Sequence, residues 1–348
     1  MFLLIFAGRD YFILFLTAFV MVGLLTPIMR IVAVRFGIVD EPSESHKTHR
    51  NPVPYLGGIA IAFGVIAVSY LAIFSSGFSK SKFLLASSIL LPGIFIGAVG
   101  LIDDFLKLSP WPRFLAQNFI GLVSSLILIL TNTLGRPTGS LFFDGLITLL
   151  WIVGLTNAIN FFDNIDGGAS GTVAISSLAL FILSIQGEQL VIAALALVLT
   201  GATLGFLIWN RPPARIYMGD AGSLFLGLII ASLSIRLEPN PINQYASFAV
   251  PFMLVAVPIL DTSVVVMKRL ARGISPFQGG RDHLSHRLMR LGLSKRQAIS
   301  SLWLLSLYFA SLAIGLSNAS FSLEGVITLL AAISWLCSFI FFAKLSDS

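Results

Sequence analysis

The sequence is short of two things that soluble and secreted proteins need, charged residues and paired cysteines. Only 11% of its 348 residues are charged, whereas soluble domains carry about 25%, so there are too few ionic side chains to cover a globular surface. The single cysteine, Cys337, has no partner, which excludes a disulfide-rich secreted scaffold. Hydrophobic residues make up 56% of the chain, and this excludes intrinsic disorder.

Long uncharged apolar runs recur along the whole chain and predict an all-α, polytopic membrane protein forming a single domain over residues 1–348. The runs show no period-two alternation, which argues against a membrane β-barrel. The first twelve residues lack a basic segment and a cleavage site, so we expect a retained first span and not a signal peptide. We expect eleven transmembrane helices at 11–34, 54–75, 83–102, 114–131, 141–159, 169–186, 189–209, 221–236, 246–267, 299–317 and 323–343.

The basic residues predict the orientation of these spans. If the N-terminus lies outside and the C-terminus is cytoplasmic, 17 of the 22 Lys and Arg fall in inner segments, as the positive-inside rule requires. This distribution accounts for the net charge of +6, and no basic run outside a membrane loop suggests nucleic-acid binding. The sequence predicts active-site loops at 35–54, 103–113, 160–168, 210–220 and 268–298 on the cytoplasmic side.

Most aspartates gather at the inner ends of the expected spans. They are Asp103, Asp104, Asp163, Asp166, Asp220 and Asp282, with Asp261 slightly deeper. Acidic residues contribute little to topology, so the topology rule does not explain this clustering. A carboxylate at the edge of the bilayer is costly and therefore marks a candidate functional site.

Two of these segments supply oxygen ligands. Asp103 and Asp104 end one span as neighbours, and a solvated helix end is the alternative interpretation. Asn160, Asp163 and Asp166 recur every three residues, with Asn164 between them, and form one polar edge of a helical turn. Such hard oxygens suit Mg²⁺, although an Asx-rich turn capping the next helix would also explain them.

Other inner segments combine acids or histidines with arginines. Asp220 precedes a span and follows Arg211 and Arg215, which suit an anionic substrate; the alternative is a simple N-cap. His283 and His286 lie three residues apart beside Arg281 and Arg287, a set that fits phosphate better than zinc. A basic surface on anionic lipid heads is the alternative here. Arg50 belongs to a basic loop that contains prolines. The alternative interpretation is that this loop only sets the topology through the positive-inside rule.

Together these segments put carboxylates, amides, histidines and arginines on one membrane face. Carboxylates repel phosphates, so a site holding both needs a divalent cation between them. The combination predicts Mg²⁺-assisted phosphoryl transfer from a water-soluble donor to an acceptor whose tail lies in the bilayer.

On five segments in the same order, the chain resembles the polyprenyl-phosphate N-acetylhexosamine-1-phosphate transferases of glycosyltransferase family 4. The segments are Asn51 to Gly58, Asp103-Asp104, Asn160 to Gly168, Met218 to Ser223 and Arg281 to Leu288. The family includes phospho-N-acetylmuramoyl-pentapeptide transferase. That enzyme has three successive histidines where this chain reads Arg-Asp-His-Leu-Ser-His-Arg, which favours the branch that uses a simpler donor such as UDP-GlcNAc.

The resemblance implies a multi-pass enzyme of the bacterial plasma membrane that starts the synthesis of a cell-envelope polysaccharide, such as lipopolysaccharide or teichoic acid. Its partners would be a UDP-N-acetylhexosamine, undecaprenyl phosphate and membrane lipid; a homodimer is left open. The cofactor would be Mg²⁺, with Mn²⁺ as a substitute, held by Asp220 and Asn160. Catalytic roles would fall to Asp103, Asp104, Asp163, Asp166, His283 and His286. Substrate binding would fall to Arg50, Asn164, Arg211, Arg215, Arg281 and Arg287.

Two other functions remain open from the residues alone. A secondary transporter would place ionisable residues near mid-membrane, and Asp261 approaches that description. A lipid-phosphate phosphatase would act at the same boundary, but we would expect a histidine nucleophile paired with arginine and fewer aspartates.

Overall fold

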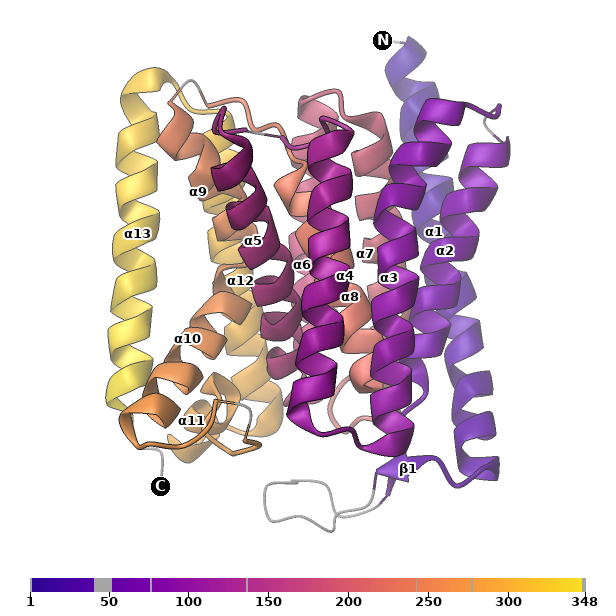
Figure 1. Ribbon diagram of the computed structural model, residues 1–348, viewed down its shortest axis with the longest axis vertical. Coiled ribbons are helices and arrows are strands. Elements are labelled where there is room, and N and C mark those ends of the chain that lie inside the picture. The colour runs from indigo at the N-terminus through magenta and orange to yellow at the C-terminus, as the bar shows by residue number, and fades with distance from the viewer. Residues whose placement is uncertain are drawn as a thin grey trace.

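The computed structural model describes residues 2–40, 52–75, 77–135, 137–241, 243–276 and 278–345. These ranges form thirteen helices, α1 to α13, most of which run roughly along one direction and form a bundle (Figure 1). The helices are α1 (Phe2–Arg35), α2 (Gly57–Ser75), α3 (Lys80–Leu106), α4 (Pro110–Leu130), α5 (Leu141–Phe162), α6 (Gly168–Gln186), α7 (Leu190–Asn210), α8 (Gly219–Ile235), α9 (Gln244–Leu254), α10 (Ala256–Ala271), α11 (Leu284–Arg290), α12 (Lys295–Ser317) and α13 (Phe321–Lys344). The prediction of a polytopic all-α membrane protein is confirmed.

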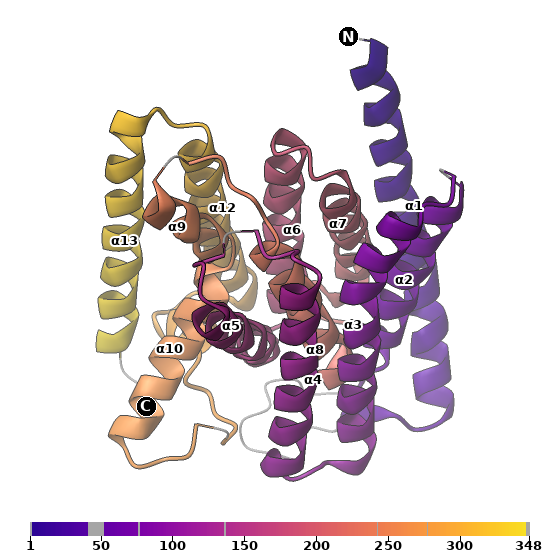
Figure 2. The same ribbon diagram turned by 45° about the horizontal axis from the view of Figure 1, so that its top comes forward.

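The predicted spans all correspond to helices, but two of them differ from expectation. Among the described residues, nine helices are long and apolar enough to cross a membrane. The predicted ninth span, 246–267, is a bent pair, in which α9 and α10 meet at 79° around Val255. Figure 2 shows the two halves as separate segments beside α13. The eighth, α8, has only 17 residues and falls short of the roughly 20 that a bilayer requires.

Helix α8 is the centre of the bundle, and α2, α3 and α5 pack around it. Every residue from Ala221 to Ser234 is buried. Small residues permit this packing, as in other membrane helix interfaces: a Cβ on Gly100 of α3 would stand 2.4 Å from the Asp220 carbonyl oxygen, and one on Gly58 of α2 would stand 2.3 Å from the Gly222 nitrogen.

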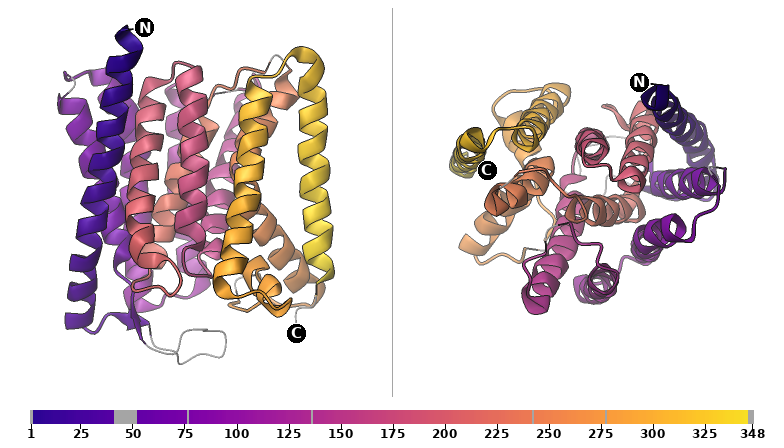
Figure 3. Two further views of the ribbon diagram at one scale, coloured as in Figure 1. Left: turned by 180° about the vertical axis from the view of Figure 1, so that it is seen from behind. Right: turned by 90° about the horizontal axis from the view of Figure 1, so that it is seen from above.

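The outermost helices carry their apolar residues on the surface. Viewed from above, α1 and α13 lie at opposite ends of the bundle (Figure 3). In the apolar windows of these two helices only 17% and 11% of residues are buried. Because Leu24, Ile31, Val326 and Leu329 remain exposed there, these helices suit a lipid environment and not water.

We call the lower end of the bundle in Figure 1 the site end. Helices α3, α5, α7 and α10 finish there, and α4, α6, α8 and α12 begin there. A short antiparallel pair of strands, β1 (Val39–Asp40) and β2 (Val53–Pro54), also lies at this end. Next to β2, the Gly57 and Gly58 amides donate to the carbonyls of Tyr217 and Met218, so the start of α2 is fixed against the start of α8.

Candidate active site

The start of α8 is capped by a carboxylate from another helix. Asp104, near the end of α3, accepts hydrogen bonds from the backbone amides of Asp220 (2.9 Å) and Ala221 (3.1 Å). Gly219 adopts a φ of +69° at this turn, and a Cβ there would stand 2.5 Å from the Asp104 carboxylate, so only glycine fits. The N-cap role, which was the alternative interpretation of Asp220, is therefore filled by Asp104, and this leaves the Asp220 side chain for other partners.

Arg113 of α4 joins Asp103 to Asp220. The same guanidinium nitrogen donates to Asp103 Oδ2 at 2.7 Å and to Asp220 Oδ2 at 2.9 Å. The other oxygen of Asp103 accepts from the Leu108 amide at 2.8 Å. Three helices, α3, α4 and α8, thus bring one cation and two carboxylates into contact.

Asn160, at the end of α5, completes the contacts of Asp220. Its Nδ2 atom donates to Asp220 Oδ1 and to Ser223 Oγ, both at 2.8 Å. Because the amide nitrogen makes these bonds, the Asn160 amide oxygen remains available as a ligand. The structure therefore places Asn160 in contact with Asp220, and joint metal binding by these two residues stays a prediction.

Asp163 directly follows α5 and lies close enough to other acids to be affected by their charge. The pKa of this half-buried carboxyl is raised well above its ordinary value, first by loss of hydration and then by the negative charges of Asp220, Asp166 and Asp104. No described side chain donates a hydrogen bond to it. We call Asp103, Asp104, Asn160, Asp163 and Asp220 the acidic cluster.

Asp166 lies next to this cluster and is held by the loop after α7. It accepts from the Ala214 amide at 3.0 Å and pairs with the Lys295 ammonium group at 3.0 Å. Asn210 holds the same turn, since its Oδ1 atom accepts from the Gly167 amide and its Nδ2 atom donates to the Ile216 carbonyl. Asp166 therefore positions the loop after α7. Sequence reasoning missed Lys295, which pairs with Asp166, and Asn210, which holds the turn that contains Gly167.

A second group of polar residues surrounds α11. His283 Nδ1 lies 2.7 Å from Asp261 Oδ2, and Asp261 Oδ1 accepts from the Leu284 amide, also at 2.7 Å. Asp261 is fully buried. The intramembrane aspartate that suggested a transporter thus orients the histidine segment.

The histidine segment is also tied to the α5–α6 turn. Ser285 Oγ donates to Asn164 Oδ1 at 2.5 Å, and the His283 ring makes an edge contact with Phe161. His286 is buried, and burial together with the neighbouring His283, Arg290 and Arg281 charges lowers its pKa to about 4. His286 is therefore neutral at physiological pH.

The predicted substrate-binding arginines occupy different places. Arg50 lies outside the described residues, and Arg281 is exposed. Arg287 is fully buried and donates to the carbonyls of Asp282, Phe342 and Leu345, which favours a role in holding α11 against the end of α13. Arg211 and Arg215 line a separate cavity with Arg296 and do not join the acidic cluster.

The acidic cluster has the composition of a magnesium site. In the described part of the chain, no three His, Cys, Asp or Glu side chains form a ready metal cage. Mg²⁺ does not require one, because it is commonly held by one or two carboxylates together with substrate phosphates and waters. Asp220 and the free amide oxygen of Asn160 fit that pattern, and the adjoining carboxylates supply the negative charge that attracts a divalent cation.

An apolar helical bundle with acids, amides and histidines at one end has the architecture of an integral membrane enzyme. The chain belongs to glycosyl transferase family 4, whose model matches residues 86–238, the region that contains the whole acidic cluster. This membership confirms the family resemblance and argues against a transporter.

Three relatives show where the chain lies within the family. It is 34% identical over 314 residues, covering 88% of this chain and 85% of the relative, to the probable undecaprenyl-phosphate N-acetylglucosaminyl 1-phosphate transferase of Bacillus subtilis. It is 34% identical over 326 residues (85% and 79%) to a decaprenyl-phosphate N-acetylglucosaminephosphotransferase of Mycolicibacterium smegmatis. A phospho-N-acetylmuramoyl-pentapeptide-transferase of Streptococcus thermophilus matches at 36% over 202 residues, 53% of this chain and 59% of the relative.

Proposed function

We propose that the protein transfers N-acetylglucosamine-1-phosphate from UDP-GlcNAc to undecaprenyl phosphate and releases UMP. This reaction would start the synthesis of a cell-envelope polysaccharide. The observation that carries the proposal is the convergence of Asp103, Asp104, Asn160, Asp163 and Asp220, from three separate segments, at one membrane end. Relatives named for this type of transfer cover most of the chain.

In this reaction an oxygen of the lipid phosphate attacks the β-phosphorus of the donor. The bond between that phosphorus and the UMP oxygen breaks, so UMP leaves and the polyprenyl diphospho-sugar remains in the membrane. Mg²⁺, held by Asp220 and Asn160, would neutralise charge on the donor phosphates. Asp103 keeps unused lone pairs beside its two hydrogen bonds and can accept a proton from the lipid phosphate; a covalent course through Asp103 remains the alternative.

The remaining residues hold the substrates and the site. Arg113 provides positive charge next to Asp103 and Asp220, where charge spreads during phosphoryl transfer. His283 and His286 border the α5–α6 turn and would contact donor phosphate or sugar, with Asp261 fixing the orientation of His283. Asp104 acts on the reaction by fixing the backbone amides of Asp220 and Ala221.

We propose that the site end faces the cytoplasm of a bacterium. Basic residues concentrate at this end, as the positive-inside rule requires, and the predicted donor is a water-soluble nucleotide. The apolar outer helices would hold the enzyme in the plasma membrane beside its lipid acceptor.

UMP release by the purified protein tests the proposal. Asp220→Asn should lower the rate at least about 100-fold, since it removes a charged group from the centre of the cluster. Asp10→Asn, which changes an exposed acid near the start of α1, serves as the matched control and should retain full activity. UMP release that continues without any divalent cation would contradict the magnesium role, and a lack of release from every UDP-N-acetylhexosamine would contradict the function.

A further inference from the structure

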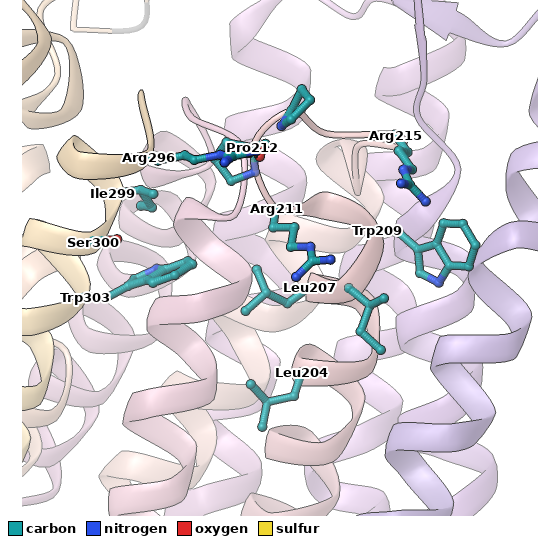
Figure 4. Close-up of a pocket in the computed structure, with 12 residues that line it drawn as sticks. Leu204, Leu207, Trp209, Arg211, Pro212, Arg215, Arg296, Ile299, Ser300 and Trp303 are labelled. Atoms are coloured by element: carbon teal, nitrogen blue, oxygen red, sulfur yellow. Dashed lines mark hydrogen bonds between the residues drawn. The ribbon is translucent and has the colours of Figure 1, made fainter. Parts of the chain in front are cut away.

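A cavity of about 730 Å³ opens at the site end between α7 and α12 (Figure 4). In Figure 4, Arg296, Ile299, Ser300 and Trp303 line one side, Trp209 and Arg215 the other, and Arg211 lies between them. None of the acidic-cluster residues lines this cavity. It is therefore a site separate from the one described above.

The mouth of the cavity is strongly basic. Arg211, Arg215 and Arg296 are all exposed, and no acidic residue lines the cavity. Within the described ranges none of the three forms an ion pair: Arg215 stacks over the Trp209 ring at 5.7 Å, and Arg296 donates to the Pro212 carbonyl at 3.2 Å. Three guanidinium groups without a carboxylate partner attract an anion, and their planar forks suit phosphate.

The deeper part of the cavity is apolar. Leu204 and Leu207 share one face of α7, and Ile299 and Trp303 share one face of α12. Leu204 precedes Arg211 by seven residues, which places it about 10 Å further along the helix axis. Two tryptophans at this depth are typical of the membrane–water boundary. The ligand must therefore join a phosphate at the mouth to an apolar chain below it.

We propose that this cavity binds an anionic phospholipid of the surrounding leaflet, with its phosphate on Arg211, Arg215 and Arg296 and its acyl chains along Leu204, Leu207 and Trp303. The polyprenyl phosphate acceptor is a less suitable occupant, because its phosphate would bind among these arginines and away from the acidic cluster. The volume accommodates the headgroup and the upper part of the chains.

The loop that carries Arg211 and Arg215 also connects this cavity to the active site. Ala214, between Arg211 and Arg215 in the sequence, donates its amide to Asp166, and the loop continues into Gly219 and Asp220. A lipid in the cavity would therefore also hold in place the loop that contacts Asp166.

Native mass spectrometry of the full chain in detergent, titrated with phosphatidylglycerol, tests the proposal. The wild type should retain phosphatidylglycerol and release phosphatidylcholine. The triple variant Arg211→Gln, Arg215→Gln and Arg296→Gln should bind phosphatidylglycerol about 100-fold more weakly, because each basic residue near a membrane surface contributes roughly a fivefold factor. The matched control is Arg9→Gln, Lys80→Gln and Lys82→Gln, which removes equal charge from the opposite end and should bind normally.

A single variant covers the case in which the triple variant fails to fold. Ser300→Glu adds one negative charge to the cavity wall and should weaken phosphatidylglycerol binding without altering an arginine. Undiminished phosphatidylglycerol binding by the triple variant or by Ser300→Glu would overturn the proposal. Equal retention of phosphatidylcholine, or capture of polyprenyl phosphate or soluble glycerol phosphate in place of phosphatidylglycerol, would also overturn it.

Discussion

Arg113 shows how a single cation shapes the charge of the acidic cluster. Its guanidinium contacts Asp103 and Asp220, which lie 117 residues apart in the chain. It therefore offsets part of the repulsion between carboxylates that a metal would otherwise have to overcome. From the sequence, Arg113 appeared only as one of many basic residues near a span end, and nothing local distinguished it from Lys107.

Replacing Arg113 with Gln should have two opposite effects on catalysis. The cluster gains one net negative charge, so less Mg²⁺ should be needed for half-maximal activity, while the maximal rate should fall about 10- to 100-fold through loss of positive charge near the phosphates. Measuring UMP release against Mg²⁺ concentration separates the two effects. Lys107→Asn, at an exposed position nearby, should change neither; an increased Mg²⁺ requirement in Arg113→Gln would refute this electrostatic role.

His286 predicts how stability depends on pH. Its pKa in the folded protein is about 4, below the ordinary value of about 6.5 that applies after unfolding. Between these values the unfolded chain binds the extra proton, so stability should fall as pH drops from about 6.5 towards 4. His286→Gln should lessen the drop in Tm between about pH 7.5 and pH 5; an unchanged drop would show that other groups cause it.

At the scale of elements, hydropathy predicted where helices lie but not how they bend. The predicted 246–267 run is apolar on both sides of Val255, so the break there could not be read from hydropathy, although Pro251 and Pro258 flank it. Helix α11 was missed because seven residues between glycine-rich and polar segments give too little periodicity. The start of α12, in contrast, is marked in the sequence, because Ser294 and Gln297 have the spacing of a capping box and form one in the structure.

The crossing of α2 and α8 should be sensitive to one methyl group. A Cβ on Gly58 would stand 2.3 Å from the Gly222 nitrogen, so Gly58→Ala should separate the helices and destabilise the protein by about 1–3 kcal/mol. Gly154→Ala on α5 is the control, since nothing lies within 4 Å of its Cβ position and alanine favours helices. Thermal unfolding in detergent compares the two, and an equal Tm would contradict close packing at Gly58.

For the whole molecule, the sequence predicted which segments contain site residues but not which of them meet. The positions of Asp103, Asp104, Asn160 and Asp220 at span ends placed them on one face, because successive spans reverse direction. Contact between them depends on the lateral order of helices, which hydropathy does not encode. This is why Arg211 and Arg215, next to Asp220 in sequence, could be assigned to the substrate although they line a different cavity.

The proposed orientation can be tested with cysteine labelling. Cys337 is the only native cysteine, so Cys337→Ala gives a cysteine-free background. A cysteine introduced by Lys80→Cys should react with an impermeant maleimide on intact cells, whereas one introduced by Arg290→Cys should react only after permeabilisation. The reverse pattern would place the site end outside and would contradict use of a cytoplasmic donor.

Helix α8 has a consequence for how the chain enters the membrane during synthesis. With 17 residues it reaches only about 25 Å, and its surroundings are protein on nearly every side. The helices that enclose it, α2, α3 and α5, are all made earlier by the ribosome. These three helices can therefore be inserted and packed before α8 is synthesised. Helix α8 can then pass from the translocon directly between them, without first being exposed to lipid.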